Sequence, residues 1–187
     1  MGPTPLCFEP SDLTWAADME HDVFPQTELN QRLANTRQIM RERGLDALVV
    51  SVPENIYYLT GLDHWGFFAC HVLVVPLQGS MALACRAMER ITIENQVKNA
   101  EFYGHADTEE LADYVHEILA DRGLASSRLG IEKRSLFMTP RIYEMILAGA
   151  ADADWVDASG IIDELRLVKS PLEQEYTRRA AAAADAG

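Results

Sequence analysis

The chain has 187 residues, enough for one domain with a hydrophobic core, and 29 acidic residues against 16 Lys and Arg give it a net charge of −13. Such a charge repels a phosphate backbone and an anionic lipid surface, and no segment approaches the roughly 20 apolar residues of a membrane-spanning helix, so we expect neither nucleic acid nor a membrane as partner. Three cysteines without metal-ligand spacing, and an acidic start unlike a secretory signal, favour a cytoplasmic protein with reduced thiols.

The first part of the chain predicts an arm, a helix and a central strand. Several prolines and the lack of a sustained hydrophobic period indicate that residues 1–26 form an extended arm laid on a surface. A helix is expected from Thr27, as its cap, to Gly44, which supplies the left-handed stop. Residues 46–51 are a short, apolar, β-branched run, which is typical of a strand in the middle of a sheet.

Strands and helices alternate in the remainder. Residues 70–76 and 80–85 are strand-like runs that we expect to form a hairpin, with Gly79 supplying a positive φ. Other strands are predicted at 101–103, 128–132 and 154–156, and other helices at 53–61, at 88–96, from a Thr108 cap to Gly123, and from a Thr139 cap to Gly149. The alternation predicts an α/β fold, with a mixed sheet of about five to six strands flanked by helices.

A capping box begins the last predicted helix. Ser170 is a capping residue, Pro171 suits the first helical position, and Glu173 completes the box, so we expect a helix to about residue 185. A helix with so strong a start signal is expected to pack on a hydrophobic core, and the remaining residues of the sequence supply none. We therefore interpret residues 167–187 as the opening of a further domain; the alternative is a C-terminal helix docked on the preceding domain.

Five stretches of the sequence carry a family resemblance. They are Arg32-Leu33, residues 44–50 (GLDALVV), residues 55–61 (NIYYLTG), residues 129–132 (LGIE) and residues 165–173 (LRLVKSPLE). Together, at these distances, they resemble the N-terminal domain of the creatinase, prolidase and Xaa-Pro aminopeptidase family, whose catalytic half has the pita-bread fold. The last stretch looks like the hinge between the two domains, and the match covers about residues 27 to 182.

The resemblance implies a division of the chain and a place for the chemistry. Residues 27–166 would form the creatinase-type N-terminal domain, which is ribonuclease H-like, and residues 167–187 the hinge and first helix of a catalytic domain. In the family the metal ligands lie downstream of the hinge, so a divalent metal (Mn, Co or Zn) is expected there and no cofactor, catalytic residue or metal ligand in this chain. The acidic pairs Asp152/Asp154 and Glu109/Glu110 are interpreted as solvated positions.

The resemblance also implies a supporting role. Such domains help to form a homodimer and lend a loop to the rim of an active site for a small peptide or amide. The loop between Leu62 and His71 would do so here, and its rim candidates, which offer apolar area and a few polar contacts, are Asp63, His64, Trp65, Phe67 and His71. The alternative for Phe67 or Phe68 is that one of them enters the core.

Two readings of function remain open. The loop lacks the arginine with which creatinase-like members hold a substrate carboxylate, and it looks closer to the loop of ectoine hydrolases and related dipeptidase-like members. One hypothesis is therefore an accessory domain of a metallohydrolase that cleaves a C–N bond next to proline or in a small cyclic or dipeptide-like substrate. The other is a non-catalytic binding or scaffold member of the family. A nucleotide or redox domain is disfavoured because no Gly-x-Gly-x-x-Gly, phosphate loop or Cys-x-x-Cys occurs.

Overall fold

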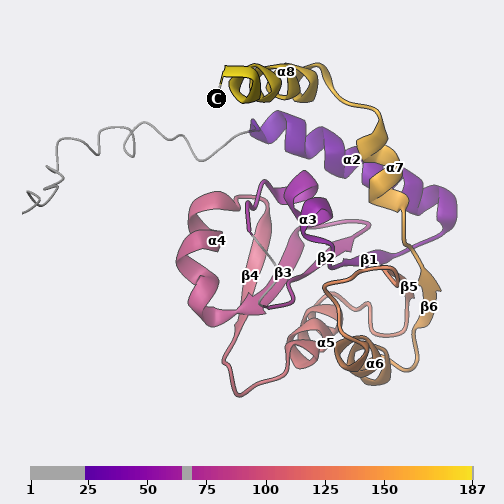
Figure 1. Ribbon diagram of the computed structural model, residues 1–187. Helices are drawn as coiled ribbons and strands as arrows, with labels where there is room; N and C mark the ends of the chain where they lie inside the picture. Colours follow the sequence, from indigo (N-terminus) through magenta and orange to yellow (C-terminus); the bar gives the residue numbers. More distant parts are fainter. Residues whose placement is uncertain (1–23, 65–68, 187) are drawn as a thin grey trace, which may run out of the picture.

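A mixed sheet with helices on both faces forms the domain in the computed structural model, which describes residues 24–64 and 69–186 (Figure 1). The sheet has six strands in the order β4-β3-β2-β1-β5-β6. Their bounds are β1 Ala47–Val50, β2 Val72–Pro76, β3 Met81–Arg86, β4 Ala100–His105, β5 Arg128–Ile131 and β6 Asp154–Asp157. The predicted α/β fold with a mixed sheet is confirmed.

The predicted central strand and hairpin are both present. All four residues of β1 are buried, because β2 pairs antiparallel on one side of it and β5 parallel on the other. Strands β2 and β3 form the antiparallel hairpin, and Gly79 in its turn has a φ of 87°. The outer pairs, β3 with β4 and β5 with β6, are parallel.

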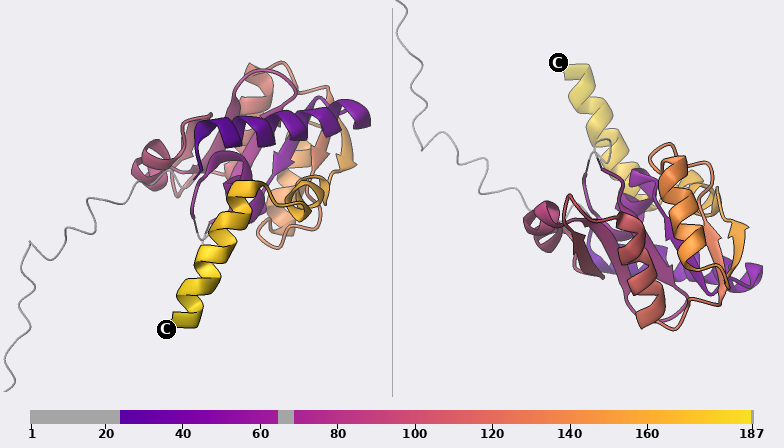
Figure 2. Two further views of the ribbon diagram at one scale, coloured as in Figure 1. Left: turned by 90° about the horizontal axis from the view of Figure 1, so that it is seen from above. Right: turned by 90° about the horizontal axis from the view of Figure 1, so that it is seen from below.

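Alternate side chains of the strands point to opposite faces of the sheet and belong to two separate cores, one on each face. Leu48 and Val50 of β1 belong to the first core, and Ala47 and Val49 to the second. The first face is covered by α2 Gln26–Arg43, α3 Pro53–Thr60, α4 Arg90–Gln96 and α7 Ile161–Leu167, and the second by α5 Leu111–Asp121 and α6 Pro140–Gly149 (Figure 2). A 3₁₀ turn, Ala87–Glu89, precedes α4, and helix α8, Pro171–Ala186, lies on the α2 side.

Three helix ends that depend on short-range contacts lie where the sequence predicts them. Gly44 ends α2 with a φ of 65°. The Thr139 hydroxyl accepts a hydrogen bond from the Ile142 backbone N–H at 3.3 Å and caps α6. In the capping box of α8, the Ser170 N–H donates to Glu173 Oε2 at 2.7 Å, and the Glu173 N–H donates to Ser170 Oγ at 3.2 Å.

Two predicted caps are wrong. Helix α2 begins at Gln26 after Pro25, so Thr27 lies inside its first turn, and no side chain caps the helix. Helix α5 begins at Leu111 rather than after Thr108, because Glu109 first closes a turn in which its carboxylate accepts a hydrogen bond from the Ala106 N–H. Helix α7 was not predicted, and it spans the expected domain boundary between residues 166 and 167.

Gly130 allows β5 to pack closely on its neighbours. A Cβ atom at this position would lie 2.7 Å from the Ala158 Cβ and 2.8 Å from Leu48 Cδ2. We therefore expect Gly130→Ala to lower the free energy of unfolding by about 2 kcal/mol through overpacking, as measured by urea denaturation. The double variant G130A/A158G should recover part of the loss, and a wild-type midpoint for G130A would contradict the expected overpacking.

Candidate functional site

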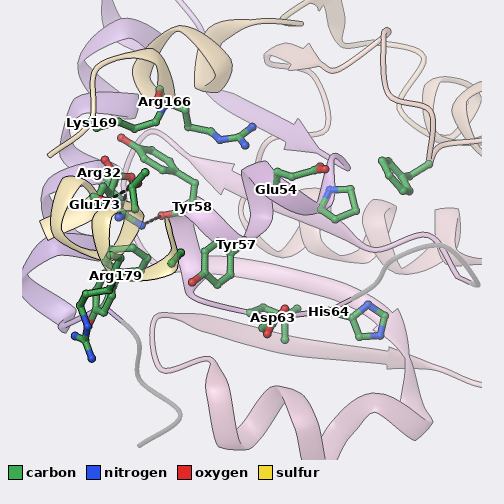
Figure 3. Close-up of a pocket in the computed structure, with 17 residues that line it drawn as sticks. Arg32, Glu54, Tyr57, Tyr58, Asp63, His64, Arg166, Lys169, Glu173 and Arg179 are labelled. Carbon is green, nitrogen blue, oxygen red and sulfur yellow. Dashed lines mark hydrogen bonds and ion pairs between the residues drawn. The ribbon is translucent and has the colours of Figure 1, made fainter. Parts of the chain in front are cut away.

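An open cavity of about 810 Å³ lies between the C-terminal end of α3 and helices α7 and α8. Its walls include Glu54, Tyr57 and Tyr58 of α3, Leu62, Asp63 and His64 of the following loop, Arg166 of α7, Lys169 between α7 and α8, and Glu173, Tyr176, Thr177, Arg179 and Ala180 of α8. Figure 3 shows Tyr57 between the Arg32 and Glu173 side chains on one side and Asp63 and His64 on the other.

The structure brings together some of the predicted rim candidates. Asp63 and His64 line the cavity, and the Asp63 N–H donates to Gln96 Oε1 at 2.9 Å. His71 is not part of the cavity wall but lies beneath His64, with their ring centroids 4.0 Å apart. Trp65 and Phe67 lie outside the described residues, as does Phe68.

A buried histidine supports His64. His71 is only 4% exposed, and its Nδ1 lies 3.1 Å from the carbonyl oxygen of Ala69. Burial, with His64 adding to it, lowers the pKa of His71 from 6.5 to about 4, so its ring is neutral at physiological pH. On its outer side, His64 Nε2 lies 3.3 Å from Glu89 Oε2. The ring of His64 is thus held between a neutral aromatic surface and a carboxylate.

Arg32 of α2 is the buried cation of the site. Its side chain is almost fully enclosed, with the guanidinium 4.0 Å from the Phe24 ring centroid and 4.6 Å from that of Tyr58. Nη1 donates to the Tyr58 carbonyl and Nη2 to Glu173 Oε1, both at 3.1 Å, and Nε lies 3.4 Å from a Glu28 carboxylate oxygen. A buried charge requires such pairing, because an unpaired one carries a large desolvation cost.

A second buried network starts at Glu132, which directly follows β5. Its Oε2 accepts hydrogen bonds from the Ser51 and Val52 N–H groups at 2.8 and 2.9 Å, and its Oε1 accepts one from Asn55 Nδ2 at 2.7 Å. Asn55 Oδ1 in turn accepts from Arg166 Nη1 at 2.8 Å. Burial raises the pKa of Glu132, which these donors partly offset. Glu132 therefore dictates which end of the Asn55 amide faces Arg166.

The five stretches that carry the resemblance meet in these contacts. Residues 44–50 and 129–132 include the paired strands β1 and β5. The stretch at Arg32 reaches the hinge stretch through Glu173, and the stretch at Asn55 reaches it through Arg166. Arg32 and Arg166 were not among the predicted rim candidates. Both nevertheless lie in stretches that the sequence analysis had already singled out.

The acidic pairs that the sequence analysis interpreted as solvated lie outside this cavity. Glu109, Asp152 and Asp154 are exposed, as predicted, and Asp154 pairs with Arg128 at 3.2 Å, whereas Glu110 is half-buried and pairs with Arg141 at 2.6 Å. Within residues 24–64 and 69–186, no group of three or more His, Cys, Asp and Glu side chains could hold a metal ion. No helix of the described part is long and apolar enough to cross a membrane.

Comparisons with known proteins agree with the resemblance. The family model of the Creatinase/Prolidase N-terminal domain matches residues 32–168. An ectoine hydrolase from Halomonas elongata is 30% identical over 164 residues, which are 83% of this chain and 41% of that protein. A creatinase from a Bacillus species is 23% identical over 165 residues, 88% of this chain and 40% of that protein.

Solved structures share the fold. An Xaa-Pro dipeptidase from Bacillus anthracis superposes with a TM-score of 0.66 at 19% identity, over 79% of this chain and 38% of that one. The chain spans about two fifths of the length of the curated relatives named above. It belongs to the Creatinase/Prolidase N-terminal domain family.

Proposed function

We propose that this chain is the accessory N-terminal domain of a larger cytoplasmic metallohydrolase of the Xaa-Pro aminopeptidase or dipeptidase type. The observation that carries this proposal is the cavity, which lies where the loop after α3 faces the hinge and α8. A domain with a purely structural role would not need polar groups arranged around such a cavity. The division into a domain at 27–166 and a hinge at 167–187 belongs to the same proposal.

The contribution of this chain is to bind and orient the substrate, a small peptide or amide, rather than to catalyse. Arg166 and Lys169 offer cationic groups to the cavity, and Glu54 and Asp63 offer carboxylates. Charges of both signs in one cavity suit a substrate that carries both an amino and a carboxylate group. The divalent metal (Mn, Co or Zn) is assigned to the catalytic domain, and no catalytic residue to this chain.

We extend the proposal to a homodimer in which the rim borders the active site of the partner subunit. Met88 and Ile91, beside the edge strand β4, are exposed apolar side chains and offer a surface for subunit contact. Reduced thiols support a cytoplasmic location: Cys70 and Cys85 are unpaired, and burial raises the pKa of each to about 12.

The direct experiment compares the complete protein with this chain alone. The metal-loaded protein is assayed with an Xaa-Pro dipeptide, a longer Xaa-Pro peptide, creatine and ectoine. We expect turnover of at least one substrate by the complete protein and none by the chain. If the complete protein turns over none of them, the non-catalytic binding or scaffold role becomes the better interpretation.

His64 provides a test of the rim itself. In the complete protein we expect His64→Ala to raise KM roughly tenfold, with little change in kcat, because the cavity loses a polar contact that acts in binding. The matched control is His105→Ala, since His105 lies on β4 outside the cavity. Equal KM values for the two variants across several substrates would remove His64 from the rim.

A further inference from the structure

Helix α8 contacts the domain through its first two turns. Glu173 reaches Arg32 of α2, and the Tyr176 ring packs edge-to-face on Phe24 with the centroids 5.4 Å apart. Residues 177–185 are exposed, and Figure 2 shows the C-terminal turns of α8 extending away from the sheet. Because so few side chains hold this helix, each of them has a large influence on its direction.

The Glu173 carboxylate makes two kinds of contact at once. Oε2 accepts the hydrogen bond from the Ser170 N–H at 2.7 Å and so closes the capping box that begins the helix. Oε1 accepts the hydrogen bond from Arg32 Nη2 at 3.1 Å. One side chain therefore both begins the helix and attaches it to α2.

Arg32 is a fixed anchor for this contact. It is 3% exposed, its Nη1 donates a hydrogen bond to the Tyr58 carbonyl, and a Glu28 carboxylate oxygen lies 3.4 Å from its Nε. On the other side of the hinge, Arg166 of α7 is held by Asn55 of α3. The hinge is thus attached to the domain both before and after the turn between α7 and α8.

We propose that Glu173 is a positioning residue that couples the first turn of α8 to α2 through its contact with Arg32. The Arg32–Glu173 contact then sets the direction in which the chain leaves the domain, and it places the α8 wall of the cavity opposite Tyr57 and Asp63. The coupling is a property of this chain alone, whereas its effect on substrate selection rests on the proposed function.

Two substitutions separate the contacts of this carboxylate. Glu173→Gln keeps the capping box, in which Gln serves as well as Glu, but removes the negative charge that binds Arg32. Ser170→Ala removes the capping hydroxyl and leaves the Arg32 contact in place. Arg32→Met removes the anchor, and because Arg32 is buried, E173Q remains the decisive variant if R32M does not fold.

Docking is measured by NMR on the 187-residue chain, from nuclear Overhauser contacts between the Phe24 and Tyr176 rings and from amide hydrogen exchange in α8. We expect E173Q to lose the ring contacts and to raise the exchange rates of residues 175–180 roughly tenfold, as for the loss of a charge-assisted hydrogen bond. S170A should keep the ring contacts. The double variant R32M/E173Q should add little to either single change, because both remove one interaction.

Ring contacts retained in E173Q, or lost equally in S170A, would overturn the coupling. A second measurement separates it from the proposed function. In the complete protein, E173Q should raise KM while largely retaining kcat, since a displaced α8 alters the rim and not the chemistry. Undocking of α8 with unchanged KM would support the coupling and count against the rim.

Discussion

Replacing Glu132 by Ala is expected to lower the free energy of unfolding by about 3–5 kcal/mol. The side chain is 5% exposed, and its two oxygens accept hydrogen bonds from the Ser51 and Val52 N–H groups and from Asn55 Nδ2. Alanine would leave these donors without an acceptor in a buried place, and each carries a desolvation cost. Urea denaturation of the two proteins measures the difference.

Two further variants are needed to interpret the loss of stability in Glu132→Ala. Glu132→Gln keeps an acceptor for the Ser51 and Val52 N–H groups and removes the buried charge, so it should cost much less than alanine. Its amide N–H₂ would face Asn55 Nδ2, however, so Asn55 must turn and present its own N–H₂ to Arg166. Glu117→Ala, on the exposed face of α5, should stay within about 0.5 kcal/mol of wild type. A Glu132→Ala protein as stable as E117A would rule out the network as a source of stability.

Acidification is expected to remove about 3 kcal/mol of stability through His71. The pKa of His71 is about 4 in the folded protein and 6.5 in the ordinary imidazole. Between these values the unfolded chain binds a proton that the folded chain does not. The contribution is therefore complete above pH 6.5 and is lost as the pH falls from 6.5 towards 4, by up to about 1.4 kcal/mol per pH unit.

His71→Phe isolates this effect, because phenylalanine fills a similar volume and does not titrate. Denaturation midpoints of both proteins are measured from pH 7.5 to 4.5. The raised pKa of Glu132 acts in the opposite direction: its contribution is complete below about 4.5 and is lost as the pH rises through the folded-state value. Glu132 is present in both proteins, so it cancels in their difference. Parallel pH curves would show that His71 does not titrate as expected.

The sequence predicted the features that short-range chemistry determines. The apolar run at 47–50, the positive φ at Gly79 and the Ser170–Glu173 capping box each need only neighbouring residues, and all are present. The caps at Thr27 and Thr108 failed because neighbouring residues decide where those helices begin: Pro25 lies before Thr27, and Glu109 closes a turn after Thr108. Helix α7 was missed because it is short and begins after Gly160 with no side-chain cap to signal its start.

The candidate site was predictable only in part, for a related reason. Asp63 and His64 were predicted because the family resemblance implies that this loop lies at the rim of an active site, and both line the cavity. The contact of Arg32 with Glu173 joins residues 141 positions apart, and that of Asn55 with Glu132 joins residues 77 apart. Hydrophobic patterning predicts which face of an element is buried, but not which polar side chains meet when elements pack. The family resemblance identified the stretches, and the structure supplied the pairing.

The order of the strands has a consequence for how the protein folds as it is synthesised. Strands β1 to β4 are consecutive in the chain and neighbours in the sheet, so these four of the six strands can assemble as soon as they leave the ribosome. Strand β1 receives its second neighbour only when Leu129 pairs with Ala47. Until then one edge of the fully buried strand β1 is open, and Arg32 lacks its Glu173 partner until the start of α8 has been synthesised. The nascent chain therefore passes through a stage in which four of the six strands are paired and β1, an inner strand of the complete sheet, is an edge strand that is exposed to aggregation.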